Sequence, residues 1–163
     1  MAEKIDVEKV LSDPDFAKYP DWIKTHLRTY LESGGEEGHL WPSGIKQGEG
    51  PAHIPTLLLT TVGRKSGKQR ILPLLYGKVG SDHIIIGSMG GAPKHPQWFL
   101  NLQANPDAEI QVGTDHYKVR ARIAEGQERE KIWSHMLTIF PVYGDYQKKT
   151  ERRIPVVVLE KQA

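Results

Sequence analysis

Positive charge is concentrated at one point of this sequence, in a segment that contains two glycines. Residues 63–70 read Gly-Arg-Lys-Ser-Gly-Lys-Gln-Arg. Glycines let the backbone turn tightly and expose its amide groups, while a guanidinium binds two oxygens of a phosphate at once. The segment therefore suits an anionic ligand. The alternative is an exposed hairpin tip that its charges keep soluble, and the spacing of a P-loop is absent.

A second glycine-rich segment, residues 87–91, reads Gly-Ser-Met-Gly-Gly and follows the apolar run that ends at Ile86. Small residues at the end of a buried strand allow a flat ligand to approach the backbone. Asn101, in the interior of a short predicted helix, calls for a polar partner. The alternative is that the loop is only a tight exit turn and that Trp98 and its apolar neighbours are core residues.

Two tyrosines, Tyr143 and Tyr146, lie three residues apart near the C-terminal end of the sequence. If the segment is helical, both point to the same side. They would then cover a substrate pocket and donate a hydrogen bond or a proton. An aromatic cap on the core is the alternative.

Several classes of site are excluded by composition. The chain of 163 residues has no cysteine, so thiolate nucleophiles, iron–sulfur ligation and disulfides are ruled out and redox chemistry needs a bound cofactor. No pair of histidines has the spacing of a helical metal site, so we predict no metal, and most of the seven histidines are expected at the surface. A net charge of +2 gives no indication of nucleic-acid binding.

Strands must position most of these groups. Apolar or alternating runs predict strands over residues 56–62, 71–76, 83–88 and 154–159, and a hairpin of two more around the turn at 113–115. Pro155 would place the last strand's start at an edge of the sheet. Helices are predicted over 96–104 and about 127–140. This pattern favours an α+β, mainly β fold with a partly open barrel, and a plain α+β sandwich is the alternative.

The helix predicted over residues 21–31 has one apolar face, which favours packing on the barrel over peripheral contact with a membrane. No run approaches the roughly 20 apolar residues of a membrane span. We expect a cytoplasmic protein, with membrane association through this helix as the alternative. The oligomeric state is left open.

Read together, the motifs have the order and spacing of a known family. Thr-Thr-Val-Gly-Arg-Lys-Ser-Gly at 60–67, Arg-Ile-Leu-Pro-Leu at 70–74, and His-Pro-Gln-Trp with Ala-Asn-Pro between 95 and 106 resemble the deazaflavin-dependent nitroreductase family of actinobacteria. The resemblance covers about residues 55 to 160. It implies a split β-barrel, related to flavin-mononucleotide oxidases, with coenzyme F420 bound in a groove between strands. Residues 51–163 would form this barrel, and residues 1–50 a helical segment and loop packed on it.

The resemblance also implies roles for individual residues. The phosphate-binding turn would comprise Arg64, Lys65, Ser66 and Gly67, with Arg70 near the acidic tail; the ring would lie over Pro73, beside Ser88, Met89 and Gly91, and the helix start would contribute Pro96, Trp98 and Asn101. Chemistry supports this assignment independently, because the phosphate and glutamate tail of F420 require cations.

In the family, the reduced deazaflavin transfers a hydride to an electron-poor acceptor. Tyr143, Tyr146 and Ser88 are the candidates to protonate or polarise that acceptor. Leu75 and Phe140 stand where pocket hydroxyls can occur in the nitroreductase branch, which favours quinones or enones over nitroaromatic compounds. The hypothesis is therefore an F420H2-dependent reductase. A non-catalytic F420 carrier and a flavin-mononucleotide oxidoreductase on the same fold are the alternatives.

Overall fold

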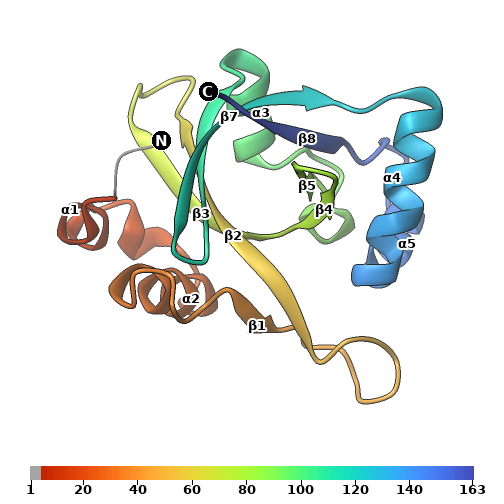
Figure 1. Ribbon diagram of the computed structural model, residues 1–163, viewed down its shortest axis with the longest axis horizontal. Helices are drawn as coiled ribbons and strands as arrows, with labels where there is room; N and C mark the ends of the chain where they lie inside the picture. The colour runs from red at the N-terminus through yellow and green to blue at the C-terminus, as the bar shows by residue number, and fades with distance from the viewer. Residues whose placement is uncertain (1–4) are drawn as a thin grey trace.

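The computed structural model describes residues 5–163, and within this range eight antiparallel strands form one sheet that curls into an open barrel (Figure 1). The sheet order is β1-β2-β6-β7-β8-β5-β4, and β3 pairs with the other side of β2. The strands are β1 (Leu40–Pro42), β2 (His53–Val62), β3 (Gln69–Leu75), β4 (Gly77–Val79), β5 (Asp82–Ile86), β6 (Asp107–Val112), β7 (Asp115–Ile123) and β8 (Val156–Lys161). The prediction of a mainly antiparallel, partly open barrel is confirmed.

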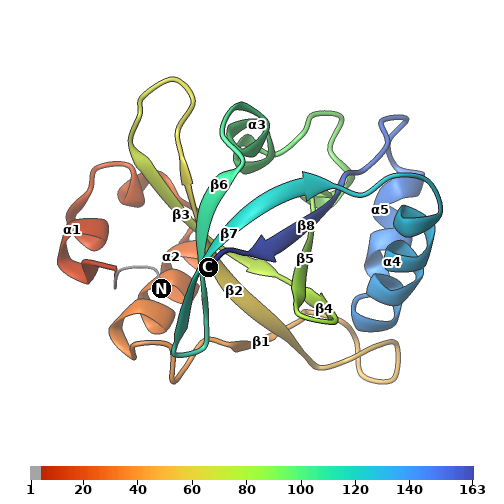
Figure 2. The same cartoon turned by 45° about the horizontal axis from the view of Figure 1, so that its top comes forward.

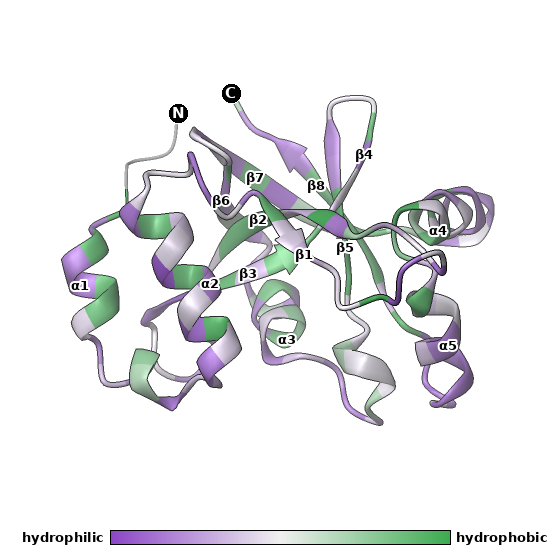
Figure 3. Cartoon of the chain, turned by 90° about the horizontal axis from the view of Figure 1, so that it is seen from below, coloured by the Kyte–Doolittle hydropathy of each residue, from purple (hydrophilic) through white to green (hydrophobic). Residues whose placement is uncertain are grey.

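Helices cover the barrel on two opposite sides and at one end. They are α1 (Val7–Ser12), α2 (Asp21–Glu32), α3 (Gln97–Ala104), α4 (Gly126–Ile139) and α5 (Val142–Lys148), with short 3₁₀ turns at Phe16–Lys18 and Met89–Gly91. Helices α1 and α2 lie on one side and α4 and α5 on the other, while α3 lies beside the tip of the β2–β3 hairpin (Figure 2). Apolar and polar residues alternate along α1, α2 and α4, as expected of helices that bury one face (Figure 3).

Strand β2 is buried on both faces because it separates two cores. Leu57 and Leu59 point into the barrel, where Trp98 and Phe99 of α3 pack, whereas Leu58 points outward against α2. This follows from the alternation of side chains along a strand. The run of apolar residues that predicts a strand covered on both faces is therefore explained by α3 on one side and α2 on the other.

Two details of the sheet differ from the sequence prediction. The short strands β1 and β4 were not predicted, since three residues are too few to produce a periodic pattern. The edge position predicted for Pro155 is wrong: β8 starts one residue later and pairs with β7 and β5 on its two sides. Pro155 therefore precedes the ladder, where its missing N–H costs no strand hydrogen bond.

Helix α2 packs on the barrel through Leu27, Tyr30 and Leu31, while Trp22 at its start is 66% exposed. None of the helices within residues 5–163 is long and apolar enough to cross a bilayer. Peripheral contact of this helix with a membrane stays a prediction, and Trp22 is the side chain that would make it.

The hydroxyl of Tyr30 joins α2 to two strands. It lies 3.0 Å from the carbonyl oxygen of Thr56 and 3.2 Å from that of Gln111, and it accepts a hydrogen bond of 2.7 Å from the amide of Gly113. Tyr30 is fully buried. Burial raises the pKa of its hydroxyl to about 12, against a smaller lowering effect of the hydrogen bond from Gly113.

We expect Tyr30→Phe to lower the free energy of unfolding by about 2 kcal/mol, because the ring stays in place while its buried partners lose their hydrogen bonds. Urea denaturation measures this change. Tyr19→Phe is the control: its hydroxyl makes one bond of 3.2 Å to Ile71 at a half-buried position, so its loss should cost less. Equal effects of the two substitutions would contradict the expectation.

Candidate functional site

The basic segment forms the tip of the β2–β3 hairpin, as the sequence predicts. The amide of Gly67 donates to the carbonyl of Gly63 at 2.8 Å, and that of Gly63 to the carbonyl of Lys68 at 2.7 Å. Gly67 has φ +70°, which a residue with a side chain adopts only at a cost. Lys65 and Lys68 are exposed and make no ion pair with any residue of the described chain. Their charges are therefore available to a ligand.

Arg64 fastens this turn to α3. Its guanidinium donates to the side-chain oxygens of Asn101 at 2.9 Å and Gln97 at 2.8 Å, and its backbone amide lies 3.2 Å from the same Asn101 oxygen. Asn101 is buried and approaches the hydroxyl of Thr61 at 3.5 Å. The polar partner that Asn101 calls for is thus the turn itself. Arg64 positions the turn, whereas the side chains of Lys65 and Lys68 are exposed to solvent.

Arg70 is engaged elsewhere. Its guanidinium pairs with the carboxylate of Asp15, which precedes the short 3₁₀ turn at residues 16–18, and only weakly approaches Ser66 at 3.5 Å. The hydrogen bond from Arg70 lowers the pKa of Asp15, with a smaller contribution from Lys18. The pair fixes the N-terminal segment to β3. The predicted contact of Arg70 with an acidic ligand tail would have to compete with Asp15.

The strand-end loop starts at the end of β5 and is held at several points. Met89 has φ +46°, rare for a residue with a side chain, and lies 55% exposed. Gly91 is buried against α5, where a Cβ would lie 2.7 Å from the carbonyl oxygen of Tyr146. The backbone amides of Ser88, Met89 and Gly90 donate to no acceptor within residues 5–163. These three consecutive donors are available to a ligand.

The remaining predicted site residues divide between the core and the loop's surroundings. Pro96 immediately precedes α3 and lies against Gly87, whereas Trp98 is 6% exposed and packs in the barrel core. Pro73 is half-buried on β3, opposite Leu58 of β2. Trp98 is therefore a core residue, which is the alternative that the sequence analysis left open. Pro96 and the loop, in contrast, are direct neighbours.

Both tyrosines are on α5, which confirms the helical geometry, but they differ in access. Tyr143 is 4% exposed, its ring centroid lies 5.0 Å from that of Phe140, and burial raises the pKa of its hydroxyl well above the usual range. Tyr146 is half-buried, 6.5 Å from Tyr143, with the ammonium of Lys149 5.7 Å above its ring. Tyr146 is therefore the more accessible of the two hydroxyls.

The histidines were in part wrongly predicted. Of the seven, His26 and His83 are buried and only His53 and His135 are fully at the surface. His26 stacks on Trp41 with ring centroids 3.8 Å apart and lies 2.9 Å from the carbonyl of Gly38. It is a structural residue of the α2–β1 connection.

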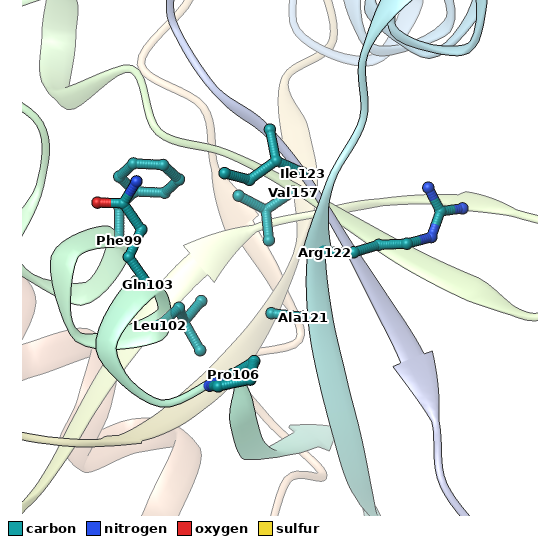
Figure 4. A pocket seen from close by; sticks show the side chains of 8 residues that line it. All are labelled: Phe99, Leu102, Gln103, Pro106, Ala121, Arg122, Ile123 and Val157. Atoms are coloured by element: carbon teal, nitrogen blue, oxygen red, sulfur yellow. The ribbon is translucent and has the colours of Figure 1, made fainter.

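A groove of about 340 Å³ lies on the side of α3 that faces β7, and its wall is mostly apolar (Figure 4). It is lined by Phe99, Leu102, Gln103, Pro106, Ala121, Arg122, Ile123 and Val157. None of the predicted site residues is among these. The groove is therefore distinct from the candidate coenzyme site.

The residues present fit a phosphorylated, flat ligand. Unpaired lysines and a hydroxyl at the hairpin tip suit a phosphate, and three free amides at the end of β5 suit the polar edge of a heterocycle. A family model described as F420H(2)-dependent quinone reductase matches residues 22–161 of this chain. The chain belongs to this family. Coenzyme F420 is therefore its cofactor, and the flavin-mononucleotide alternative is set aside.

Individual proteins similar to this chain agree with the family assignment. The chain is 34% identical to an F420H2-dependent quinone reductase of Mycobacterium tuberculosis over 143 residues, which are 86% of this chain and 90% of that protein. A solved F420H2-dependent reductase is 42% identical with a TM-score of 0.61, covering 65% of this chain and 94% of that one. A structure described as a domain-swapped dimer is 36% identical with a TM-score of 0.63, covering 86% and 98%. The predictions of an F420-dependent oxidoreductase and of a split barrel are confirmed.

The sequence did not reveal the residues that hold the candidate site together. These are Gln97, which binds Arg64, Asp15, which binds Arg70, and Arg152, which contacts the strand-end loop. Each lies at least 33 positions from its partner, so no local pattern could reveal the contact.

Proposed function

We propose that this protein reduces a quinone, or the activated C=C bond of a conjugated carbonyl compound, with F420H2 as the hydride donor. The observation that carries the proposal is the family match over residues 22–161. When bound, the reduced coenzyme supplies the hydride that the acceptor takes up. The acceptor also takes up one proton, which the protein or water must deliver.

The turn at residues 63–67 would hold the phosphate. Lys65 and Ser66 would contact its oxygens, and Arg64 would keep the turn against α3 through Asn101 and Gln97. In this assignment most binding energy comes from charge-assisted hydrogen bonds. The fixed turn reduces the conformational freedom that binding must remove.

The acceptor would lie on the α5 side of the loop, where the surroundings are apolar. Phe140 and Tyr143 belong to one buried cluster, and Leu75 and Tyr146 pack against it. An apolar wall favours a flat quinone or enone over a nitro group, whose charge-rich oxygens would lack partners. Nitroaromatic compounds would accordingly be poorer acceptors. Tyr146, the more accessible tyrosine, would deliver the proton or polarise the acceptor's oxygen, with Tyr143 and Ser88 as supporting groups.

The experiment combines purified protein with enzymatically reduced F420 under anaerobic conditions and adds a naphthoquinone, a cyclic enone or a nitroaromatic compound. Appearance of the oxidised coenzyme's absorbance measures turnover. We expect rates well above the protein-free reaction for the quinone or the enone, and slower turnover of the nitro compound.

Saturable coenzyme binding without turnover of any acceptor would contradict the proposal and support the carrier alternative. Equal rates for all three acceptors would contradict the assignment of an apolar acceptor pocket while leaving the reductase activity in place. The two failures are therefore distinguishable.

A further inference from the structure

Arg152, in the connection between α5 and β8, makes three side-chain hydrogen bonds to the strand-end loop, residues 87–92. Its guanidinium donates to the carbonyl oxygens of Gly87 at 3.0 Å, Ser88 at 2.7 Å and Ala92 at 2.8 Å. It also lies 3.1 Å from Nδ1 of His95. One side chain thus ties together both ends of the loop and the approach to α3.

The backbone that carries Arg152 is itself fixed. The side-chain amide of Gln147, on α5, donates to the carbonyl of Arg152 at 2.8 Å and accepts from the amide of Ile154 at 3.0 Å. The amide of Arg152 lies 3.3 Å from the hydroxyl of Thr150. The guanidinium is therefore presented from a rigid turn, and α5 and the loop are coupled through it.

The loop's hydrogen bonding is divided between its two kinds of backbone group. Arg152 takes the carbonyls of Gly87 and Ser88, whereas the amides of Ser88, Met89 and Gly90 keep no acceptor within residues 5–163. A guanidinium carries only donors, so it binds the carbonyl groups of the loop and leaves the amide groups free for another acceptor. The unusual backbone at Met89, with φ +46°, needs such external restraint because its conformation is costly by itself.

We propose that Arg152 is a positioning residue, which holds the loop at residues 87–92 in the conformation whose free amides receive the coenzyme's heterocycle. The proposal rests on the proposed function for the identity of the ligand. Arg152 touches neither coenzyme nor acceptor in it. Its effect is to prepare the loop before binding, so that less order has to be gained when the coenzyme arrives.

The test compares Arg152→Met and Arg152→Lys with the control Arg129→Met. Arg129 is buried, whereas Arg152 is half-buried; Arg129 donates to the carbonyl of Ile154 at 2.6 Å, two residues after Arg152, and makes no hydrogen bond to the loop within residues 5–163. Hydrogen exchange of the loop's hydrogen-bonded amides, those of Gly87, Gly91 and Ala92, is measured without coenzyme. Titration gives the Kd for oxidised F420, and steady-state rates give KM and kcat separately.

For Arg152→Met we expect faster loop exchange, a Kd raised about tenfold or more, and a kcat at saturating coenzyme that changes much less. Arg152→Lys should restore part of the affinity, since an ammonium still reaches one carbonyl but cannot fork. Arg129→Met should lower the melting temperature and leave loop exchange and Kd unchanged.

Wild-type exchange and wild-type Kd in both Arg152 variants would overturn the proposal, and so would equal effects of Arg152→Met and Arg129→Met. If the wild-type protein binds no F420, the proposed function fails, but the exchange measurement still decides whether Arg152 holds the loop. Should Arg152→Met not fold, Arg152→Lys provides the same comparison.

Discussion

Replacing Arg64 and Lys65 together by alanine is expected to weaken binding of oxidised F420 by about a hundredfold or more. Each charge-assisted hydrogen bond contributes about 1.5–3 kcal/mol, and 1.4 kcal/mol corresponds to a factor of ten. Fluorescence titration of the coenzyme measures the change. Affinity of the wild-type protein should also fall with added salt, because Lys65 is exposed.

The single variants separate two contributions. Arg64→Ala removes the bonds to Asn101 and Gln97 that hold the turn against α3, so it should lower the melting temperature as well as the affinity. Lys65→Ala should lower affinity alone. Lys118→Ala with Arg120→Ala is the control, since both lie on β7 at exposed positions and remove the same charge. If the Arg64, Lys65 double variant bound F420 with unchanged affinity, the coenzyme's phosphate would not bind at this turn.

The protein is expected to lose about 3 kcal/mol of unfolding free energy between pH 6.5 and pH 4 through one histidine. His83 is 2% exposed, and its Nδ1 has no hydrogen-bond partner in the described part of the chain. Burial, with smaller effects of Lys161 and Lys78, lowers its pKa to about 4. As pH falls, the unfolded chain binds a proton near pH 6.5, before the folded protein does. This stability is therefore complete above pH 6.5 and lost on acidification.

The measurement is urea denaturation at a series of pH values for the wild type and His83→Phe. Phenylalanine suits a site between Tyr76 and Tyr117, whose ring centroids lie 5.3 and 6.1 Å from that of His83. The difference between the two curves should rise as pH falls and flatten above pH 6.5. His135→Gln, at an exposed position, should leave the curve unchanged. Titration of the His83 imidazole near pH 6.5 in the folded wild type, measured by NMR, would contradict the expectation.

The sequence was informative where a pattern is local. Apolar runs located β2 and β5, alternation of apolar and polar residues located β6 and β7, and glycines with charge located the hairpin tip. The three isoleucines that follow His83 in β5 indicate a buried strand. A single histidine at the start of such a run has no periodic pattern of its own, so its burial was not predicted. Contacts such as Arg64 to Gln97 or Arg152 to Ser88 depend on how α3 and α5 meet the barrel, which only tertiary structure determines.

The ion pair between Asp15 and Arg70 joins the N-terminal segment to the hairpin that would bind the coenzyme. These residues lie 55 positions apart, yet the carboxylate cancels a charge on the same hairpin that presents Lys65 and Lys68. A homologue with a neutral residue in place of Asp15 would present one more uncompensated cation there. Its preference would shift toward coenzyme molecules with longer, more anionic oligoglutamate chains.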